Sequence, residues 1–95
     1  MVMEEKTNRE LALKYIKNER DRQIQLWGTE DEILHRFPEE TWNSYLRTKL
    51  VVLMEEVGEL SKEALEHRKS HALSEAIQVA AVSLAIVEGL LSTNE

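Results

Sequence analysis

The sequence contains no cysteine, so neither a disulfide bond nor a thiolate metal site can stabilise the chain. It has one proline and three glycines in 95 residues, with no sustained alternation of apolar and polar positions and no hairpin dipeptide. These absences predict an all-α protein. The longest run of apolar or small residues, 79–87, is too short to cross a bilayer, and no secretory signal is visible. We therefore expect a cytoplasmic protein with no membrane partner.

An excess of positive charge is also missing. The chain carries 18 acidic against 12 basic residues, a net charge of -6, which argues against nucleic acid as a partner. A phosphorylated metabolite remains compatible with this charge if a cation mediates its binding. The length allows one domain, 1–95. A domain of this size buries roughly 60–70% of the surface that its unfolded chain exposes, so its stability as a monomer is marginal. Oligomerisation is the expected additional source of stability.

Three helices are predicted, over 8–27, 39–66 and 72–91. Thr7 or Asn8 can cap the first helix, and Gly28 can end it. Residues 29–37 are expected to form a loop or short turn. Pro38 suits the first turn of the second helix, and residues 67–70 form the second connection.

Apolar residues follow a heptad spacing on the second helix, and a second strip beside it contains Gly58. The third helix repeats the spacing and is apolar on nearly all sides, so it must be buried nearly all round. Three helices cannot enclose two such surfaces, which predicts a three-helix protomer in an oligomeric four-helix-type bundle. Close helix approach in that bundle is the simpler reason for Gly58. The heptad positions are Leu46, Leu50, Leu53, Val57, Leu60 and Ala64, then Leu73, Ile77, Ala80, Leu84, Val87 and Leu91.

The second helix carries three carboxylates, Glu55, Glu56 and Glu59, and the third begins with the polar pair Glu75 and Gln78. Residues at i and i+3 share a helix face, so Glu56/Glu59 and Glu75/Gln78 can each present two oxygens. Facing one another, these pairs would hold Mg²⁺ or Mn²⁺. The alternative is a solvated charged face. Two features argue against a solvated face. The second helix has neighbouring carboxylates that repel one another, and the third helix has a polar pair although it is otherwise apolar.

A Mg²⁺ ion held by carboxylates with open positions commonly binds substrate phosphates. An uncoordinated carboxylate nearby can act as a general base, and Glu55, beside Glu56 and one turn from Glu59, suits that role.

These residues resemble the all-α nucleoside triphosphate pyrophosphohydrolases of the MazG-like group, in particular their small phage-type members. Their pattern is Glu-Glu-x-x-Glu on one helix and Glu-x-x-Asp on the next. The matching positions are 55–59 and Glu75, with further similarity at Gln23, 27–28, Trp42, 78–82 and Glu88.

The resemblance implies Mg²⁺-dependent hydrolysis of a (d)NTP to the monophosphate and pyrophosphate by a homodimer or dimer of dimers. It suggests Glu56, Glu59 and Glu75 as metal ligands and Glu55 as the base. Gln78 stands where the family has Asp. Weaker metal binding, a role in orienting water or substrate, and loss of activity are the three readings of that change.

Four further residues are candidates for substrate contact. Gln23 is a candidate only because of the resemblance. Trp27 is either a core or interface aromatic or a stacking platform for a nucleobase. Lys49 and Lys62 either pair with the acids or neutralise triphosphate charge. A catalytically silent helical dimer, acting as an interaction or regulatory module, is the alternative to the enzyme.

Overall fold

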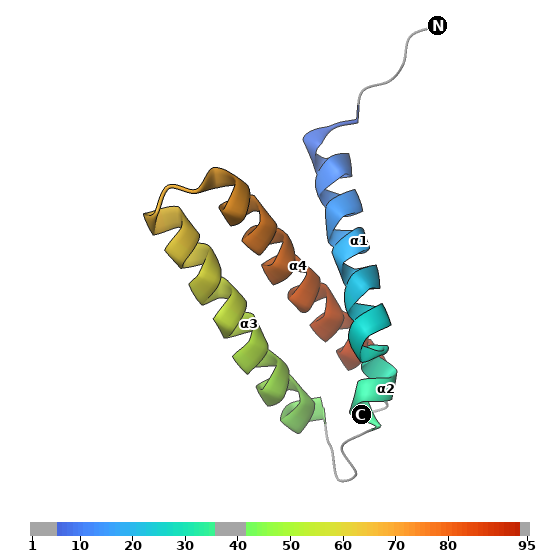
Figure 1. Ribbon diagram of the computed structural model, residues 1–95. Helices are drawn as coiled ribbons and strands as arrows, with labels where there is room; N and C mark the ends of the chain where they lie inside the picture. The colour runs from blue at the N-terminus through green and yellow to red at the C-terminus, as the bar shows by residue number, and fades with distance from the viewer. Residues whose placement is uncertain (1–5, 36–41, 94–95) are drawn as a thin grey trace, which may run out of the picture.

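The computed structural model describes residues 6–35 and 42–93 (Figure 1). Their helices are α1 (Asn8–Trp27), α2 (Glu30–Leu34), α3 (Trp42–Leu65) and α4 (Lys69–Leu91), and no strand occurs among them. The predicted all-α fold is confirmed for this part of the chain. α4 contacts all three other helices, and in Figure 1 it lies between α1 and α3.

The ends of α1 follow the capping residues of the sequence. The Thr7 hydroxyl accepts a hydrogen bond from the Glu10 amide at 3.1 Å, which satisfies one of the free N–H groups of the first turn. Gly28 ends the helix with φ 90°, a conformation that L side chains rarely adopt, and its amide donates to the Ile24 carbonyl at 2.8 Å. The predicted bounds, 8–27, are confirmed.

The segment after α1 is more regular than expected, because residues 30–34 form the short helix α2. The Thr29 hydroxyl accepts from the Glu32 amide at 3.2 Å and donates to the Glu32 carboxylate at 3.1 Å. Thr29 and Glu32 thus have the spacing of a capping box, which is a signal for the start of a helix. The prediction of a loop or short turn over residues 29–37 did not take this signal into account.

The connection between α3 and α4 is also shorter than predicted. α3 ends at Leu65, and His67 adopts a left-handed φ of 57° that turns the chain. α4 begins at Lys69, three residues before the expected start at Ala72. The described part of α3 begins at Trp42; Pro38 and residues 39–41 lie outside the described residues.

The buried apolar residues lie in the C-terminal half of α4, as Ala81, Val82 and Ala85, and near the start of α3, as Tyr45. The Tyr45 hydroxyl donates to the Ala85 carbonyl at 3.2 Å. Gly89 makes room for the Tyr45 ring: a Cβ atom at position 89 would collide with the ring and its hydroxyl. No such contact explains Gly58, since a Cβ atom there would meet nothing within 4 Å. Close approach of helices within the protomer is therefore not the reason for Gly58.

Much of the apolar surface of α3 and α4 is uncovered in the single chain. The most exposed large apolar side chains on these helices are Val51, Met54, Leu65, Leu73, Val87 and Leu91, each more than half exposed. α4 is also long and apolar enough to cross a membrane by length and composition alone, a test that core helices of soluble proteins pass as well. Two of the four helices therefore have apolar faces that no other described residue of the protomer covers.

Candidate functional site

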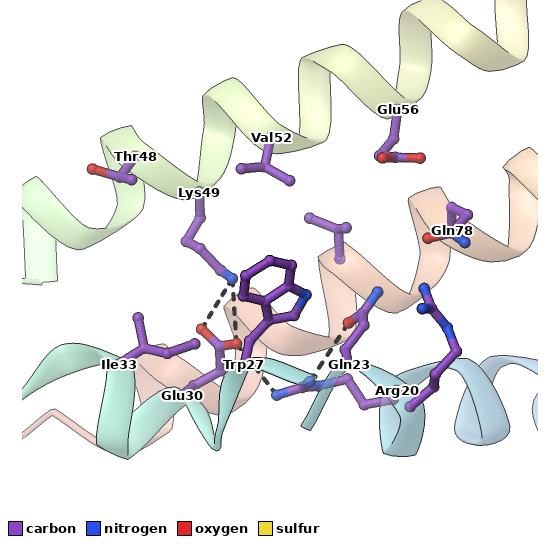
Figure 2. A pocket seen from close by; sticks show the side chains of 12 residues that line it. Arg20, Gln23, Trp27, Glu30, Ile33, Thr48, Lys49, Val52, Glu56 and Gln78 are labelled. Atoms are coloured by element: carbon purple, nitrogen blue, oxygen red, sulfur yellow. Dashed lines mark hydrogen bonds and ion pairs between the residues drawn. The ribbon is translucent and has the colours of Figure 1, made fainter. Parts of the chain in front are cut away.

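A cleft of about 480 Å³ lies between α3 and the pair α1 and α2, and α4 contributes to its lining (Figure 2). Thr48, Val52 and Glu56 line it from α3 because they recur every four residues on one helix face. The other lining residues are Lys49 from α3, Arg20, Arg22, Gln23 and Trp27 from α1, Glu30 and Ile33 from α2, and Gln78 and Val82 from α4.

This cleft brings together five residues singled out from the sequence, which come from three helices: Gln23, Trp27, Lys49, Glu56 and Gln78. The other four predicted site residues do not line it. Glu55, Glu59 and Lys62 are exposed on α3, and Glu75 is half-buried on α4.

Glu56 and Glu75 form a pair of neighbouring carboxyl groups. Burial raises the pKa of Glu56 above its ordinary value of 4.5, and the adjacent Glu75 carboxyl raises this pKa further. Glu75 Oε2 is buried, and among the described residues it has no hydrogen-bond partner. A buried carboxylate oxygen without a donor is destabilising. No Lys, Arg or His of 6–35 and 42–93 forms an ion pair with Glu56 or Glu75.

The four predicted metal ligands are not gathered into one group. Within 6–35 and 42–93, no three His, Asp or Glu side chains are close enough together to hold a metal ion. Glu59 and Glu55 act on Glu56 through their charge, which further raises the pKa of Glu56. Because both side chains are exposed at the surface of α3, they are free to change rotamer toward a cation.

Glu19 on α1 does not itself line the cleft, but it bonds to two residues that do, and the sequence reading missed it. Arg22 binds Glu19 through two hydrogen bonds of 2.8 and 2.6 Å and lowers the pKa of Glu19 below its ordinary value of 4.5, although burial opposes this. Gln23 donates to Glu19 at 3.4 Å, and hydrogen bonding from Gln78 also favours the ionised form. Gln78 therefore lies between the cleft and an ionised carboxylate.

The outer part of the cleft is apolar and aromatic. Trp27 is 64% exposed although it lines the cleft, so it is not the core aromatic that one reading of the sequence allowed. Val52 and Ile33 complete this part of the lining. An accessible indole ring beside two apolar side chains is suited to stacking with a planar ring.

One end of the cleft rests on a set of linked polar groups, which we call the Glu30 network: Arg20, Glu30, Tyr45, Lys49 and Glu88. Arg20, Glu30 and Tyr45 are buried, whereas Lys49 and Glu88 are partly exposed. Glu30 accepts hydrogen bonds from the Arg20 guanidinium at 3.3 Å, from the Lys49 ammonium at 3.2 Å and from the Tyr45 hydroxyl. Arg20 also binds Glu88 at 2.9 Å. Two cations and two carboxylates balance one another.

Burial next to the Glu30 carboxylate raises the pKa of the Tyr45 hydroxyl far above its ordinary value, so Tyr45 is a hydrogen-bond donor at any physiological pH. The sequence reading assigned no role to Arg20, Glu30 or Tyr45. Only Arg20 had a signal in the sequence, because its spacing to Gln23 and Trp27 places these three side chains on one face of α1.

Comparison with known protein families, curated proteins and solved structures finds no match to this chain. The chemistry of the cleft is therefore the basis on which a function can be inferred.

Proposed function

We propose that this protein is a Mg²⁺-dependent nucleoside triphosphate pyrophosphohydrolase. It would hydrolyse a (d)NTP with one water to the nucleoside monophosphate and pyrophosphate. The observation that supports this proposal is the composition of the cleft: an ammonium group, an exposed indole and a carboxyl group of raised pKa line one cavity, as Lys49, Trp27 and Glu56.

The chemistry of the acidic end fits a hard divalent cation. In the described part of the chain, Glu75 Oε2 is buried without a donor, and burial together with the neighbouring carboxylates raises the pKa of Glu56, so a cation would supply what both groups lack. Glu56 and Glu75, joined by Glu59 and Gln78, would hold Mg²⁺ or Mn²⁺. The ion would supply neutralisation of phosphate charge and a Lewis acid.

The remaining residues have separate roles in this proposal. Lys49 contacts the phosphate chain and offsets its charge, and Trp27, with Gln23 beside it, receives the nucleoside. Glu55 accepts a proton from the attacking water. Lys62 lies outside the cleft, three residues beyond Glu59, and would contact the phosphates only at their far end.

We further propose that the enzyme works in the cytoplasm as a homodimer or dimer of dimers, in an oligomeric four-helix-type bundle. The uncovered apolar faces of α3 and α4 support self-association, because exposed apolar patches of this kind mark interaction surfaces. The net charge of -6 supports a metal-bridged substrate rather than nucleic acid.

The test is a panel of ribo- and deoxynucleoside triphosphates incubated with Mg²⁺ or Mn²⁺, with pyrophosphate and orthophosphate measured separately. The proposal requires pyrophosphate and the nucleoside monophosphate in equal amounts. A Glu56→Gln/Glu59→Gln double variant serves as the control for a contaminating phosphatase. Release of orthophosphate alone, or equal rates with the double variant, contradicts the proposal.

A catalytically silent helical dimer is the second candidate, and the uncovered faces of α3 and α4 favour it too. The two candidates differ at the acidic end of the cleft. An interaction module has no need of divalent cations, whereas the enzyme must bind them. Calorimetric titration with Mg²⁺ and Mn²⁺ separates the two.

A further inference from the structure

Glu30 is the most unusual charge in this small protein. It is 3% exposed, although it belongs to a helix of only five residues. Removing a carboxylate from water is costly unless its partners compensate. The role of this buried charge can be inferred from the partner that has no acceptor other than Glu30.

Two of its three partners have other acceptors. Arg20 also binds Glu88, through its Nε at 3.1 and 3.2 Å and its Nη2 at 2.9 Å. The Tyr45 hydroxyl is also within hydrogen-bond distance of the Ala85 carbonyl, at 3.2 Å. Lys49 differs, because Glu30 is its one acceptor in the described part of the chain, at 3.2 Å from each carboxylate oxygen.

Lys49 and Arg20 both line the cleft, but Arg20 has Glu88 as a second acceptor, whereas Lys49 depends on Glu30. The Lys49 side chain is 17% exposed and lines the cavity, and Figure 2 shows it extending from α3 toward Glu30 on α2, past Trp27. An ammonium group has three donors, and contact with a single carboxylate leaves at least one of them for another acceptor. Lys49 and Glu56 are seven residues apart on α3, which separates the two ends of the cleft by about 10 Å along the helix axis.

We propose that Glu30 is a positioning residue, which fixes the Lys49 ammonium at the wall of the cleft as the contact for a chain of phosphates. This inference rests on the proposed function and names the part of the substrate that Lys49 receives. Without Glu30 the flexible lysine side chain has many rotamers, and binding an anion must restrict them. Holding the ammonium in place beforehand reduces that loss.

The probe is inorganic tripolyphosphate in the presence of Mg²⁺, with binding followed by calorimetry on the full chain. Glu30→Gln keeps the size of the side chain but removes the charge that holds Lys49. We expect its affinity for tripolyphosphate to fall roughly tenfold, the usual loss for one charge-assisted contact. Glu88→Gln is the matched control, because it removes the other carboxylate of the network without touching Lys49, and its affinity should stay within about twofold of wild type.

A double-variant cycle separates positioning from a general effect on the fold. If Glu30 acts through Lys49, Glu30→Gln causes no further loss of affinity in a Lys49→Met background. An additional tenfold loss there, or equal losses for Glu30→Gln and Glu88→Gln, overturns the inference. If Glu30→Gln does not fold by circular dichroism, Glu30→Asp replaces it; with the charge kept but the reach shortened, an intermediate loss is expected, and wild-type affinity overturns the inference.

The outcome for the wild-type protein distinguishes this inference from the proposed function. If wild type binds tripolyphosphate but releases no pyrophosphate from any nucleotide, the proposed hydrolase activity is contradicted. The role of Glu30 is then still tested by the double-variant cycle of binding affinities. A chain that cleaves nucleotides, with Glu30→Gln at wild-type KM and wild-type tripolyphosphate affinity, contradicts the role of Glu30 alone. No binding of tripolyphosphate by wild type overturns this inference.

Discussion

The ring of Tyr45 occupies the space that any side chain at Gly89 would need. This close approach of α3 to α4 holds the Tyr45 hydroxyl against Glu30, and through Glu30 it is connected to the wall of the cleft. The packing of the core and the position of the charged groups are therefore linked.

Gly89→Ala should destabilise the protein, by about 1–3 kcal/mol in the free energy of unfolding, because the new methyl group forces the Tyr45 ring to move. Denaturant titration followed by circular dichroism measures the change. Gly58→Ala is the matched control, since its methyl group meets nothing within 4 Å and α3 gains about 1 kcal/mol from the better helix former. Unchanged stability in Gly89→Ala would show that Tyr45 is not held there. Lower stability in Gly58→Ala would place position 58 at an interface between copies.

The raised pKa of Glu56 predicts how stability depends on pH in metal-free buffer. The folded state holds the Glu56 proton more tightly than the unfolded chain, so this contribution is complete below the ordinary pKa of 4.5. It is lost as the pH rises through the raised pKa of the folded state. The free energy of unfolding should therefore fall between pH 4.5 and neutrality more steeply in wild type than in Glu56→Gln.

A metal ion should stabilise the protein through the same group of carboxylates. At neutral pH, millimolar Mg²⁺ or Mn²⁺ should raise the melting temperature, since it relieves the repulsion within the folded state only. The shift should be absent in the Glu56→Gln/Glu59→Gln double variant. An equal shift in that variant would falsify the metal site.

The sequence predicted what depends on local signals. Thr7 and Gly28 defined α1, and Glu56 and Gln78, which the sequence named as candidates, both line the cleft. The Glu30 network was beyond its reach, because its ion pairs join residues 20, 30, 49 and 88, and no local pattern relates positions so far apart. The start of α2 was not predicted, although Thr29 and Glu32 have the spacing of a capping box.

The uncovered apolar surface predicts self-association. Met54 is 65% exposed in the single chain, and Met54→Glu would introduce a charge into the proposed interface. We expect light scattering to show an oligomer for wild type at micromolar concentration and the 11.0 kDa monomer for Met54→Glu. Leu13→Glu on α1, at a position 60% exposed, is the control and should remain oligomeric. A monomeric wild type refutes the oligomeric bundle.

Gln78→Asp should change metal affinity and metal-free stability in opposite directions. Another carboxylate in the cleft, near Glu56 and Glu19, adds repulsion and lowers the melting temperature of the metal-free protein. The same charge favours a hard cation and should tighten Mg²⁺ binding. Calorimetric titration and thermal melting measure the two effects. Weaker binding with an intact fold would mean that the amide of Gln78 serves the site in another way, such as by orienting a water molecule.

The last prediction separates the base from the metal ligands. Glu55 is exposed and outside the cleft lining, whereas Glu56 lies within it, so their substitutions should differ in kind. Glu55→Gln should reduce kcat by roughly 10²–10⁴-fold, with metal affinity close to wild type, because a general base contributes in the transition state. Glu56→Gln and Glu59→Gln should lose metal affinity and turnover together.

Metal affinity and single-turnover rates for the three single variants decide the assignment. A base must be within hydrogen-bond reach of the water that it deprotonates, directly or through one further water, so this role requires the exposed Glu55 side chain to turn toward the cleft. If all three variants lose metal affinity and rate in parallel, Glu55 is a ligand, and the proton must go elsewhere. If Glu55→Gln retains full turnover, the residue is a solvated surface group, and Glu19 becomes the next carboxylate to test, because its lowered pKa keeps it ionised beside Gln78.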